Sequence, residues 1–334
     1  MTSDVDSGRR RTLLALPATA ALAALAACGR NAPSATRAAA AAPATTLVLG
    51  DQVNLLRTKA EAAGVLAGAP YNIKWASFQG AAPLFEAVVS GDVDTAMAAD
   101  TPALAAAAGG ARIKVVAASV TSPKSVAILV PPGSPIRTVA DLKGRQVIVS
   151  SARGSVAHYL LFGTLRAAGM RPDDVRTGFM LPSDAAVAFA GGQVEAWATF
   201  GVYQAAAELR GARILRDGVG INSGIAVIAA SDAALGNAAK RTALADVLAR
   251  LDRSYAWANA HPAEYEHIFQ KLTGLPPDVV RKVVARDRPR LVPIDAHIVG
   301  QLQDVADAFY DAKLFPRRVD ASALVEPTLF TPTA

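Results

Sequence analysis

The chain has 334 residues, enough for one large domain or two medium ones, and 52% of them are hydrophobic, so a sizeable core can be buried and general disorder is excluded. The formal net charge of +6 suits an anionic partner or none in particular, and no Lys/Arg block interleaved with aromatic residues follows the N-terminal segment, which argues against nucleic acid. A single cysteine leaves no pair for a disulfide.

The N-terminal segment has the order of an export signal. Arg9, Arg10 and Arg11 precede an apolar run over residues 13–27, which is too short to cross about 30 Å of hydrocarbon comfortably. The arginines fit a twin-arginine (Tat) signal and a Sec signal about equally well. The run ends in Leu-Ala-Ala-Cys, which looks like a bacterial lipobox, so we predict a signal peptide over residues 1–27 and lipidation of Cys28.

The predicted location follows from that signal. The mature protein would be exported to the periplasm or the cell surface and tethered to the membrane by its lipid. Residues 28–44, rich in Ala, Pro, Ser and Thr, are predicted to be a flexible linker.

Strands and helices alternate in two passes after the linker. The first pass has expected strands at 46–50, 72–75, 93–98 and 113–118 and expected helices at 55–68, 83–90 and 102–108. The second has strands at 146–149 and 194–199 and helices at 155–168 and 183–190, followed by a helical tail with a long helix at 240–260. The fold class is therefore predicted to be α/β with a largely parallel sheet.

An internal echo predicts two similar lobes. Residues 85–96 and 186–197 both read as a helix, a glycine turn and an apolar strand entered by an acid, although two unrelated helix–strand turns could share this punctuation. Apolar stretches at 125–130 and 225–229 could cross between lobes. We then expect a discontinuous lobe I over residues 45–125 and 226–334, lobe II over residues 126–225, and a ligand cleft between them.

Strand-to-helix junctions are the candidate ligand sites, because a helix start offers free N–H groups and partial positive charge to an anion. At 151–158, Gly154 permits close backbone approach, Ser155 can cap the helix and Arg153 can add a charged fork; His158 lies one turn further. At 99–102, Thr101 is a good N-cap, whereas Asp100 would have to pair with an arginine, cap the helix or meet an amine of the ligand. Plain capping is the alternative at both junctions.

Further junctions complete the predicted ligand-binding set. Gln79 can donate and accept, Ser183 and Asp184 open another helix, and Phe200 and Tyr203 could form an apolar wall or pack in the core. The whole set is Gln52, Gln79, Asp100, Thr101, Arg153, Gly154, Ser155, His158, Ser183, Asp184, Phe200 and Tyr203.

Catalytic and metal motifs are sparse. The sequence has no Gly-x-Ser-x-Gly, no Walker loop and no cysteine after Cys28 to act as a nucleophile. His261 and His267 are six residues apart, so they do not share a helix face as a metal-binding pair would. We therefore predict no enzyme, no metal and no cofactor.

The ordered set of junctions resembles the nitrate/taurine/aliphatic-sulfonate group of ABC-importer substrate-binding proteins, most closely its aliphatic-sulfonate members. The resemblance extends over about residues 45–320 and is carried by the stretches 75–84, 91–94, 99–102, 122–130, 139–144, 154–161, 181–185 and 306–310. It implies a type II periplasmic-binding-protein fold that closes over a small anion, with an ABC permease and ATPase as partners, and we expect a monomer.

The resemblance leaves the ligand open. An aliphatic sulfonate or related organosulfur compound is expected, with nitrate, taurine or a thiamine-pyrimidine precursor as alternatives and a desulfinase-like enzyme as a more distant one. The family often has Trp-Asp-Pro-Phe where this chain has Phe200, Gly201, Val202 and Tyr203, which reshapes one wall of the cleft. The ligand could therefore be bulkier than a simple alkanesulfonate.

Overall fold

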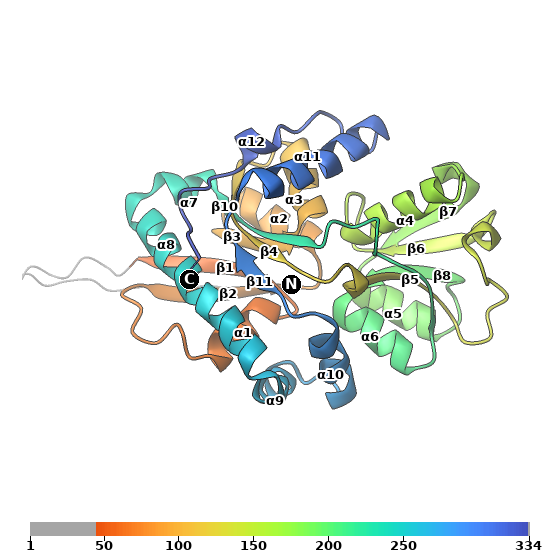
Figure 1. Ribbon diagram of the computed structural model, residues 1–334, viewed down its shortest axis with the longest axis horizontal. Coiled ribbons are helices and arrows are strands. Elements are labelled where there is room, and N and C mark those ends of the chain that lie inside the picture. The colour runs from red at the N-terminus through yellow and green to blue at the C-terminus, as the bar shows by residue number, and fades with distance from the viewer. Residues whose placement is uncertain (1–44, 333–334) are drawn as a thin grey trace, which may run out of the picture. The chain divides into compact units, whose positions relative to one another are not determined.

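The computed structural model describes residues 45–332, which form two α/β lobes, each built around its own sheet (Figure 1). The sheet of the first lobe has six strands in the order β11-β4-β10-β3-β1-β2, and that of the second lobe has five in the order β7-β6-β8-β5-β9. The predicted signal peptide, Cys28 and the linker lie outside the described residues.

The first lobe contains both ends of the described chain. Its strands are β1 (Thr46–Gln52), β2 (Asn72–Phe78), β3 (Thr95–Ala99), β4 (Ile113–Val120), β10 (Ile225–Ser231) and β11 (Arg290–Val292). Its helices are α1 (Leu55–Ala62), α2 (Ala81–Ser90), α3 (Asp100–Gly109), α7 (Asp232–Gly236), α8 (Ala238–Ala260), α9 (Pro262–Thr273), α10 (Pro277–Arg286), α11 (Ala296–Asp311) and α12 (Ala321–Leu324).

The second lobe is one uninterrupted stretch of chain. Its strands are β5 (Val126–Val130), β6 (Gln146–Ser150), β7 (Arg176–Met180), β8 (Ala196–Phe200) and β9 (Arg213–Asp217), and its helices are α4 (Val156–Ala167), α5 (Pro182–Ala190) and α6 (Gly201–Leu209). Short 3-10 turns at Pro123–Ser125, Val139–Leu142 and Pro172–Asp174 complete the list.

Both sheets are mixed rather than largely parallel. Strands β1, β2 and β3 run parallel to their neighbours within the first pass, as do β6, β7 and β8 within the second. Strands β10 and β5, by contrast, pair antiparallel with both of their neighbours. The prediction failed here because both strands adjoin the segments at which the chain changes lobe, and each enters its sheet from the opposite direction.

Helices cover both faces of each sheet. In the first lobe, α2, α3 and α11 pack on one face and α1, α7 and α8 on the other. In the second lobe, α4 covers one face and α5 and α6 the other. Strands buried on both faces read as continuous apolar runs, as Val126–Val130 and Ile225–Ser231 do.

The internal echo has a structural counterpart in Asp94 and Glu195. Asp94 Oδ2 accepts the N–H of Val48 at the start of β1, at 2.8 Å, and Glu195 Oε2 accepts the N–H of Gln146 at the start of β6, at 3.0 Å. Each acid also pairs with a cation: Lys240 at 2.6 Å and Arg145 at 2.8 Å, respectively. The same position of the repeat thus performs the same capping role in both lobes.

Two short segments connect the lobes, at residues 121–125 and 218–224. They are bonded to each other, because Thr121 donates its N–H to Gly224 O at 2.7 Å and its hydroxyl to the same oxygen at 3.1 Å. Gly224 has φ +74°, and a Cβ there would lie 2.8 Å from Thr121 O, so only glycine allows this approach.

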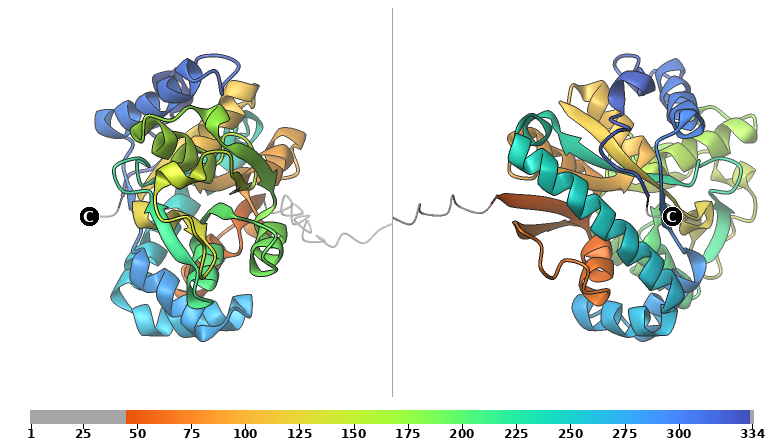
Figure 2. Two further views of the ribbon diagram at one scale, coloured as in Figure 1. Left: turned by 90° about the vertical axis from the view of Figure 1, so that its right-hand side faces the viewer. Right: turned by 60° about the vertical axis from the view of Figure 1, so that its left-hand side comes forward.

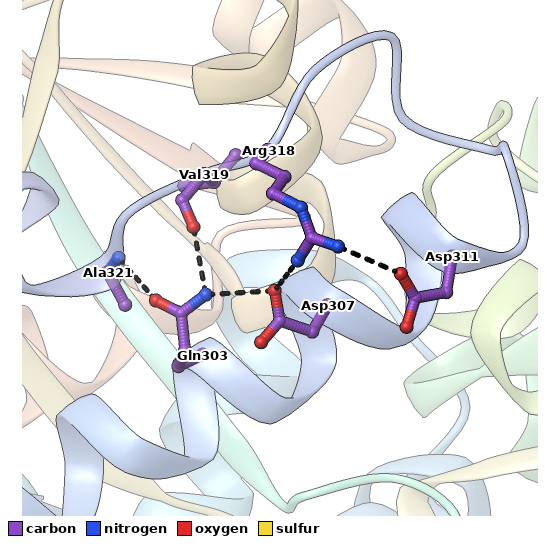
Figure 3. Close-up of polar contacts among 6 residues, drawn as sticks. All are labelled: Gln303, Asp307, Asp311, Arg318, Val319 and Ala321. Atoms are coloured by element: carbon purple, nitrogen blue, oxygen red, sulfur yellow. Dashed lines mark hydrogen bonds and ion pairs between the residues drawn. The ribbon is translucent and has the colours of Figure 1, made fainter.

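The C-terminal segment returns to α11 and is held there by a polar network (Figure 3). The Gln303 Nε2 group donates to Asp307 Oδ1 at 3.1 Å and to Val319 O at 3.0 Å. Arg318 reaches Asp307 at 3.2 Å and Asp311 at 3.4 Å. These bonds fix the segment after α11 on the first lobe, beside the aromatic contacts between the lobes described below.

Candidate ligand-binding site

A cavity of about 780 Å³ lies between the two lobes. Small-molecule sites commonly have volumes of roughly 300–1,000 Å³. The carboxyl ends of β1, β3, β6 and β8 reach the cavity, so it occupies the position at which open α/β sheets bind ligands.

Five helices that each follow a strand begin at the wall of this cavity. The residues of their first turns that line it are Leu55 of α1, Ala81 and Ala82 of α2, Asp100 and Pro102 of α3, Val156 of α4, and Gly201 and Val202 of α6. Helices α2 and α6 have no side-chain cap, so their first N–H groups are left for another acceptor. Such an arrangement favours an anion.

The start of α4 has the cap that the sequence predicts. Ser155 is the N-cap, 5% exposed, and its hydroxyl accepts the N–H of His158 at 3.2 Å. Arg153 is exposed, and its guanidinium carbon lies 5.4 Å from the ring centroid of Phe179. Ser155 and Arg153 both line the cavity, which places a positive charge beside a helix start.

Gly154 and His158 lie behind the cavity wall, contrary to the prediction that they bind ligand. The Gly154 N–H donates to His158 Nδ1 at 3.1 Å, and burial, together with the charge of Arg153, lowers the pKa of His158 to about 4. Gly154 has φ +78°, and a Cβ there would lie 2.6 Å from the Cβ of Ala105 in the other lobe. These two residues therefore shape the loop that presents Ser155.

Thr101 is not the N-cap of α3, and it is fully buried away from the cavity. The helix begins at Asp100 with Ala99 as its N-cap. Asp100 Oδ1 accepts the Thr101 N–H at 2.5 Å and its hydroxyl at 2.8 Å, and Oδ2 accepts a short bond from Ser223. Burial raises the pKa of Asp100. Asp100 lines the cavity with its oxygens engaged, and Thr101 positions it.

The side-chain amides of Gln52 and Gln79, which are predicted to bind ligand, form hydrogen bonds within the protein. Gln52 lines the cavity and donates to Met97 O at 2.8 Å. Gln79 lines the cavity and accepts the hydroxyl of Ser183 at 2.5 Å. Ser183 and the exposed Asp184 do not line the cavity, so the prediction that they contact ligand is not supported by their position; Ser183 instead bonds across the lobes.

Phe200 and Tyr203 lie on the wall of the cavity at the start of α6. Their rings meet edge to face with centroids 6.5 Å apart, and burial raises the pKa of the Tyr203 hydroxyl. Together with Phe85 of α2 they give the cavity an aromatic, apolar surface that suits the hydrocarbon part of a ligand.

Two further wall residues, Ser151 and Lys59, are absent from the ligand-binding set that the sequence predicts. Ser151 has φ +76°, and its hydroxyl has no hydrogen-bond partner among the described residues. A Cβ at Gly80 would lie 2.8 Å from that hydroxyl, so the loop before α2 packs directly on it. Lys59 of α1 is 7% exposed. The sequence contains no signal for either, since a left-handed serine and a buried lysine both depend on tertiary contacts.

The charged side chains of the wall balance in number, with Lys59, Arg153, Arg286 and Arg288 against Asp51, Glu86, Asp100 and Asp287. Burial raises the pKa of three of these acids, that of Asp51 to about 6, and hydrogen bonds from the protein hold them. Attraction for an anion therefore arises locally, at the helix starts and at individual cations, rather than from the net charge of the wall.

Contacts between the lobes lie on both sides of the cavity. On one side Phe309 of α11 meets Tyr159 and His158 of α4, with ring centroids 5.1 and 5.9 Å apart. On the other, Glu208 of α6 bonds Arg286 of α10 at 2.7 Å. Figure 2 shows the same arrangement in two further views, with α9 and α10 on the side away from α4 and α11.

Residues 45–332 contain neither a metal-binding cluster nor a membrane-spanning helix. No group of three or more His, Cys, Asp or Glu side chains in that range could hold a metal ion. None of the helices described there is both long and apolar enough to span a bilayer.

Comparison with known proteins identifies the family. Residues 78–265 match the family described as NMT1/THI5 like. A protein of Escherichia coli (strain K12), named as an aliphatic sulfonates-binding protein, is 35% identical over 251 residues, covering 74% of this chain and 77% of the relative. The chain belongs to the NMT1/THI5-like family.

Solved structures of relatives agree with this assignment. The alkanesulfonate-binding protein SsuA from Xanthomonas axonopodis pv. citri, bound to MOPS, has a TM-score of 0.78 and 30% identity, covering 88% of this chain and 100% of that one. The periplasmic aliphatic sulphonate binding protein SsuA from Escherichia coli has a TM-score of 0.73 and 31% identity, covering 84% and 97%. This NMT1/THI5-like chain therefore has the two-lobed fold of periplasmic binding proteins and a substrate-binding role.

Proposed function

We propose that this chain is the extracytoplasmic solute-binding component of an ABC importer and that it holds an organosulfonate anion between its lobes. The observation that carries the proposal is the convergence of five helix starts on one cavity, with Arg153 and Ser155 at one of them. A sulfonate is fully ionised at neutral pH and has three acceptor oxygens, so it can bond several N–H groups at once.

The relatives support the same ligand class. Each of the relatives described above is named as a sulfonate-binding protein, and one of the solved structures is bound to MOPS, a compound that ends in a sulfonate. The aromatic wall formed by Phe200 and Tyr203 favours a ligand with an apolar body over nitrate, which has none. Taurine and a thiamine-pyrimidine precursor are the other ligands to be compared.

We further propose that the chain binds its ligand without chemical conversion. A desulfinase that uses a cysteine nucleophile needs a thiol at the site, and the single cysteine of this chain, Cys28, directly follows the predicted signal peptide and is expected to be lipidated. Purified protein incubated with an aryl sulfinate should release no sulfite. The lipid anchor at Cys28 and export before it acts are parts of the same proposal.

Calorimetry tests the proposed ligand. Residues 29–334, dialysed against Tris buffer free of sulfonates, would be titrated with a series of alkane-1-sulfonates, MOPS, taurine, nitrate, sulfate and a thiamine-pyrimidine precursor. We expect saturable binding of at least one sulfonate, tighter than that of nitrate or sulfate. Absence of heat and of any thermal shift with every sulfonate would overturn the proposed ligand class.

A further inference from the structure

Lys59 is a buried cation on the wall of the cavity. It lies on α1 and is only 7% exposed, and it lines the cavity together with Tyr265. Its ammonium donates to Leu55 O, one turn earlier, at 3.2 Å. The side chain of Tyr265 contributes a second hydrogen bond, so the protein supplies two partners for an ammonium that has three hydrogens to donate.

Two aromatic rings complete the immediate surroundings of this ammonium. Its nitrogen lies 5.3 Å from the ring centroids of both Tyr255 and Tyr265, within the range of a cation–π contact. Burial lowers the pKa of Lys59, but the two tyrosines and Asp287 more than offset it, so the pKa lies above its ordinary value. Lys59 is therefore charged at neutral pH.

No carboxylate within 4.0 Å pairs with Lys59 among residues 45–332. Lys240 and Lys282, by contrast, reach carboxylate oxygens at 2.6 and 3.0 Å. A buried charge that lacks a direct counter-ion costs free energy, and it favours any ligand that brings one.

The two carboxylates that attract Lys59, those of Asp51 and Asp287, accept hydrogen bonds from backbone N–H groups. Asp51 accepts the N–H groups of Gln52, Leu56 and Arg57 at 2.7 to 3.0 Å. Asp287 accepts the N–H of Ser122 at 2.8 Å. Both attract Lys59 from a distance, and neither forms a direct ion pair with it among residues 45–332.

Lys59 and Arg153 belong to different sides of the cavity. Lys59 and Tyr265 come from α1 and α9, which lie on the side away from α3, α4 and α11, whereas Arg153 precedes α4 (Figure 1). The wall that they share also includes the apolar residues Phe85, Phe200 and Val202. The cavity wall thus carries cations from different sides, Lys59 and Arg153 among them, together with apolar surface.

We propose that Lys59 is a second anchoring point and that the preferred ligands are sulfonates with a second anionic group, such as a carboxylate, at the far end of an apolar chain. This inference rests on the proposed function, because it takes the sulfonate to be held at the start of α4. A purely structural Lys59, which only holds α1 against α9, is the competing explanation.

The test compares matched ligands by calorimetry in Tris buffer at pH 7.5. Alkane-1-sulfonates with two to eight methylenes would be paired with sulfonates of the same length that carry a terminal carboxylate. A charge-assisted contact predicts that the best carboxylated sulfonate binds roughly 10-fold or more tightly than its plain partner. Lys59→Met should abolish this preference and leave the affinity for plain alkanesulfonates within about threefold.

Lys74→Met is the matched control. Lys74 is exposed on β2 and is not a wall residue of the cavity, so the same loss of charge there should keep the preference. If Lys59→Met does not fold, Lys59→Gln removes the charge while retaining a donor for Leu55 O, and it should lose the preference equally.

The outcomes separate the two proposals. If plain sulfonates bind but no carboxylated sulfonate of any length binds more tightly, or if the Lys59 variants keep the preference, the second anchoring point is overturned and the proposed function stands. If no sulfonate of either series binds, both are overturned.

Discussion

The hydroxyl of Ser183 donates to Oε1 of Gln79 at 2.5 Å and thereby joins α5 of the second lobe to the loop before α2 of the first. Gln79 lies on the wall of the cavity and Ser183 outside it. The bond exists only while the lobes are together, so it stabilises the form that encloses a ligand rather than the ligand itself.

Ser183→Ala removes this bond and should weaken sulfonate binding. A neutral, partly exposed hydrogen bond of this kind corresponds to about a 3- to 10-fold increase in Kd. Because the change acts on the closed form, stopped-flow measurement should show it mainly as faster ligand release. Ser322→Ala is the control, since the hydroxyl of Ser322 bonds Asp320 within one lobe at 2.6 Å and Ser322 does not line the cavity. Equal Kd values for the Ser183 variant and the parent would contradict the assignment.

Arg153→Ala tests the charge beside the start of α4. We expect Kd for a sulfonate to rise roughly 10-fold, because a charge-assisted contact or nearby cation is lost, and the dependence of Kd on salt to become shallower. Calorimetry at two salt concentrations measures both effects.

The control for that experiment is Arg137→Ala. Arg137 is also exposed and belongs to the same lobe, but it does not line the cavity. Thermal unfolding of both variants should match the parent, since neither side chain is buried. If the two arginine variants bind equally well, Arg153 does not contact the ligand.

Capping rules account for the residues that the sequence placed correctly. Ser155 follows a strand and a glycine and precedes an apolar helix, and the local rule holds because an N-cap needs only its own helix. The equivalence of Asp94 and Glu195 could be predicted for a similar reason, since each occupies the same position of a repeated helix–turn–strand unit. The two-lobed α/β fold follows from that alternation.

Residues whose surroundings depend on tertiary packing were misplaced or missed. Thr101 and His158 have good local signatures, but tertiary packing buries both of them away from the cavity, where they bond the nearby residues Asp100 and Gly154. Lys59 occupies a helix position at which a lysine is ordinarily solvated, and only α8 and α9 make it a buried residue. The antiparallel crossing strands were missed because short apolar runs carry no sign of direction.

His158 should make stability dependent on pH. Its folded pKa of about 4 lies below the ordinary value of 6.5, so the unfolded chain binds more protons than the folded one between these pH values. The contribution of His158 is therefore fully present above pH 6.5 and is lost as the pH falls toward 4. Asp51, whose folded pKa is raised to about 6, acts in the opposite direction, so the effect has to be isolated by a variant.

His158→Asn provides that comparison, because an asparagine oxygen can still accept the N–H of Gly154. Urea unfolding at pH 7.5 and pH 5 should show a smaller loss of unfolding free energy for the variant than for the parent, by about 1 to 2 kcal/mol. An identical pH dependence in the two proteins would mean that the pKa of His158 is the same in the folded and unfolded states.

Glu208 should be the most sensitive ion-pairing residue between the lobes. Both of its oxygens lie 2.7 Å from Arg286 Nη2, Lys282 lies at 3.0 Å, and its side chain is 9% exposed. Glu208→Gln leaves the buried guanidinium without a counter-ion, so we expect a loss of about 2 to 4 kcal/mol in urea unfolding. Lys282→Met, which removes the more exposed partner, should cost less than about 1 kcal/mol.

The double variant Glu208→Gln, Arg286→Met should recover part of the loss in unfolding free energy, because no unpaired charge then remains. A double variant that is less stable than Glu208→Gln alone would argue that packing, not charge, dominates this contact.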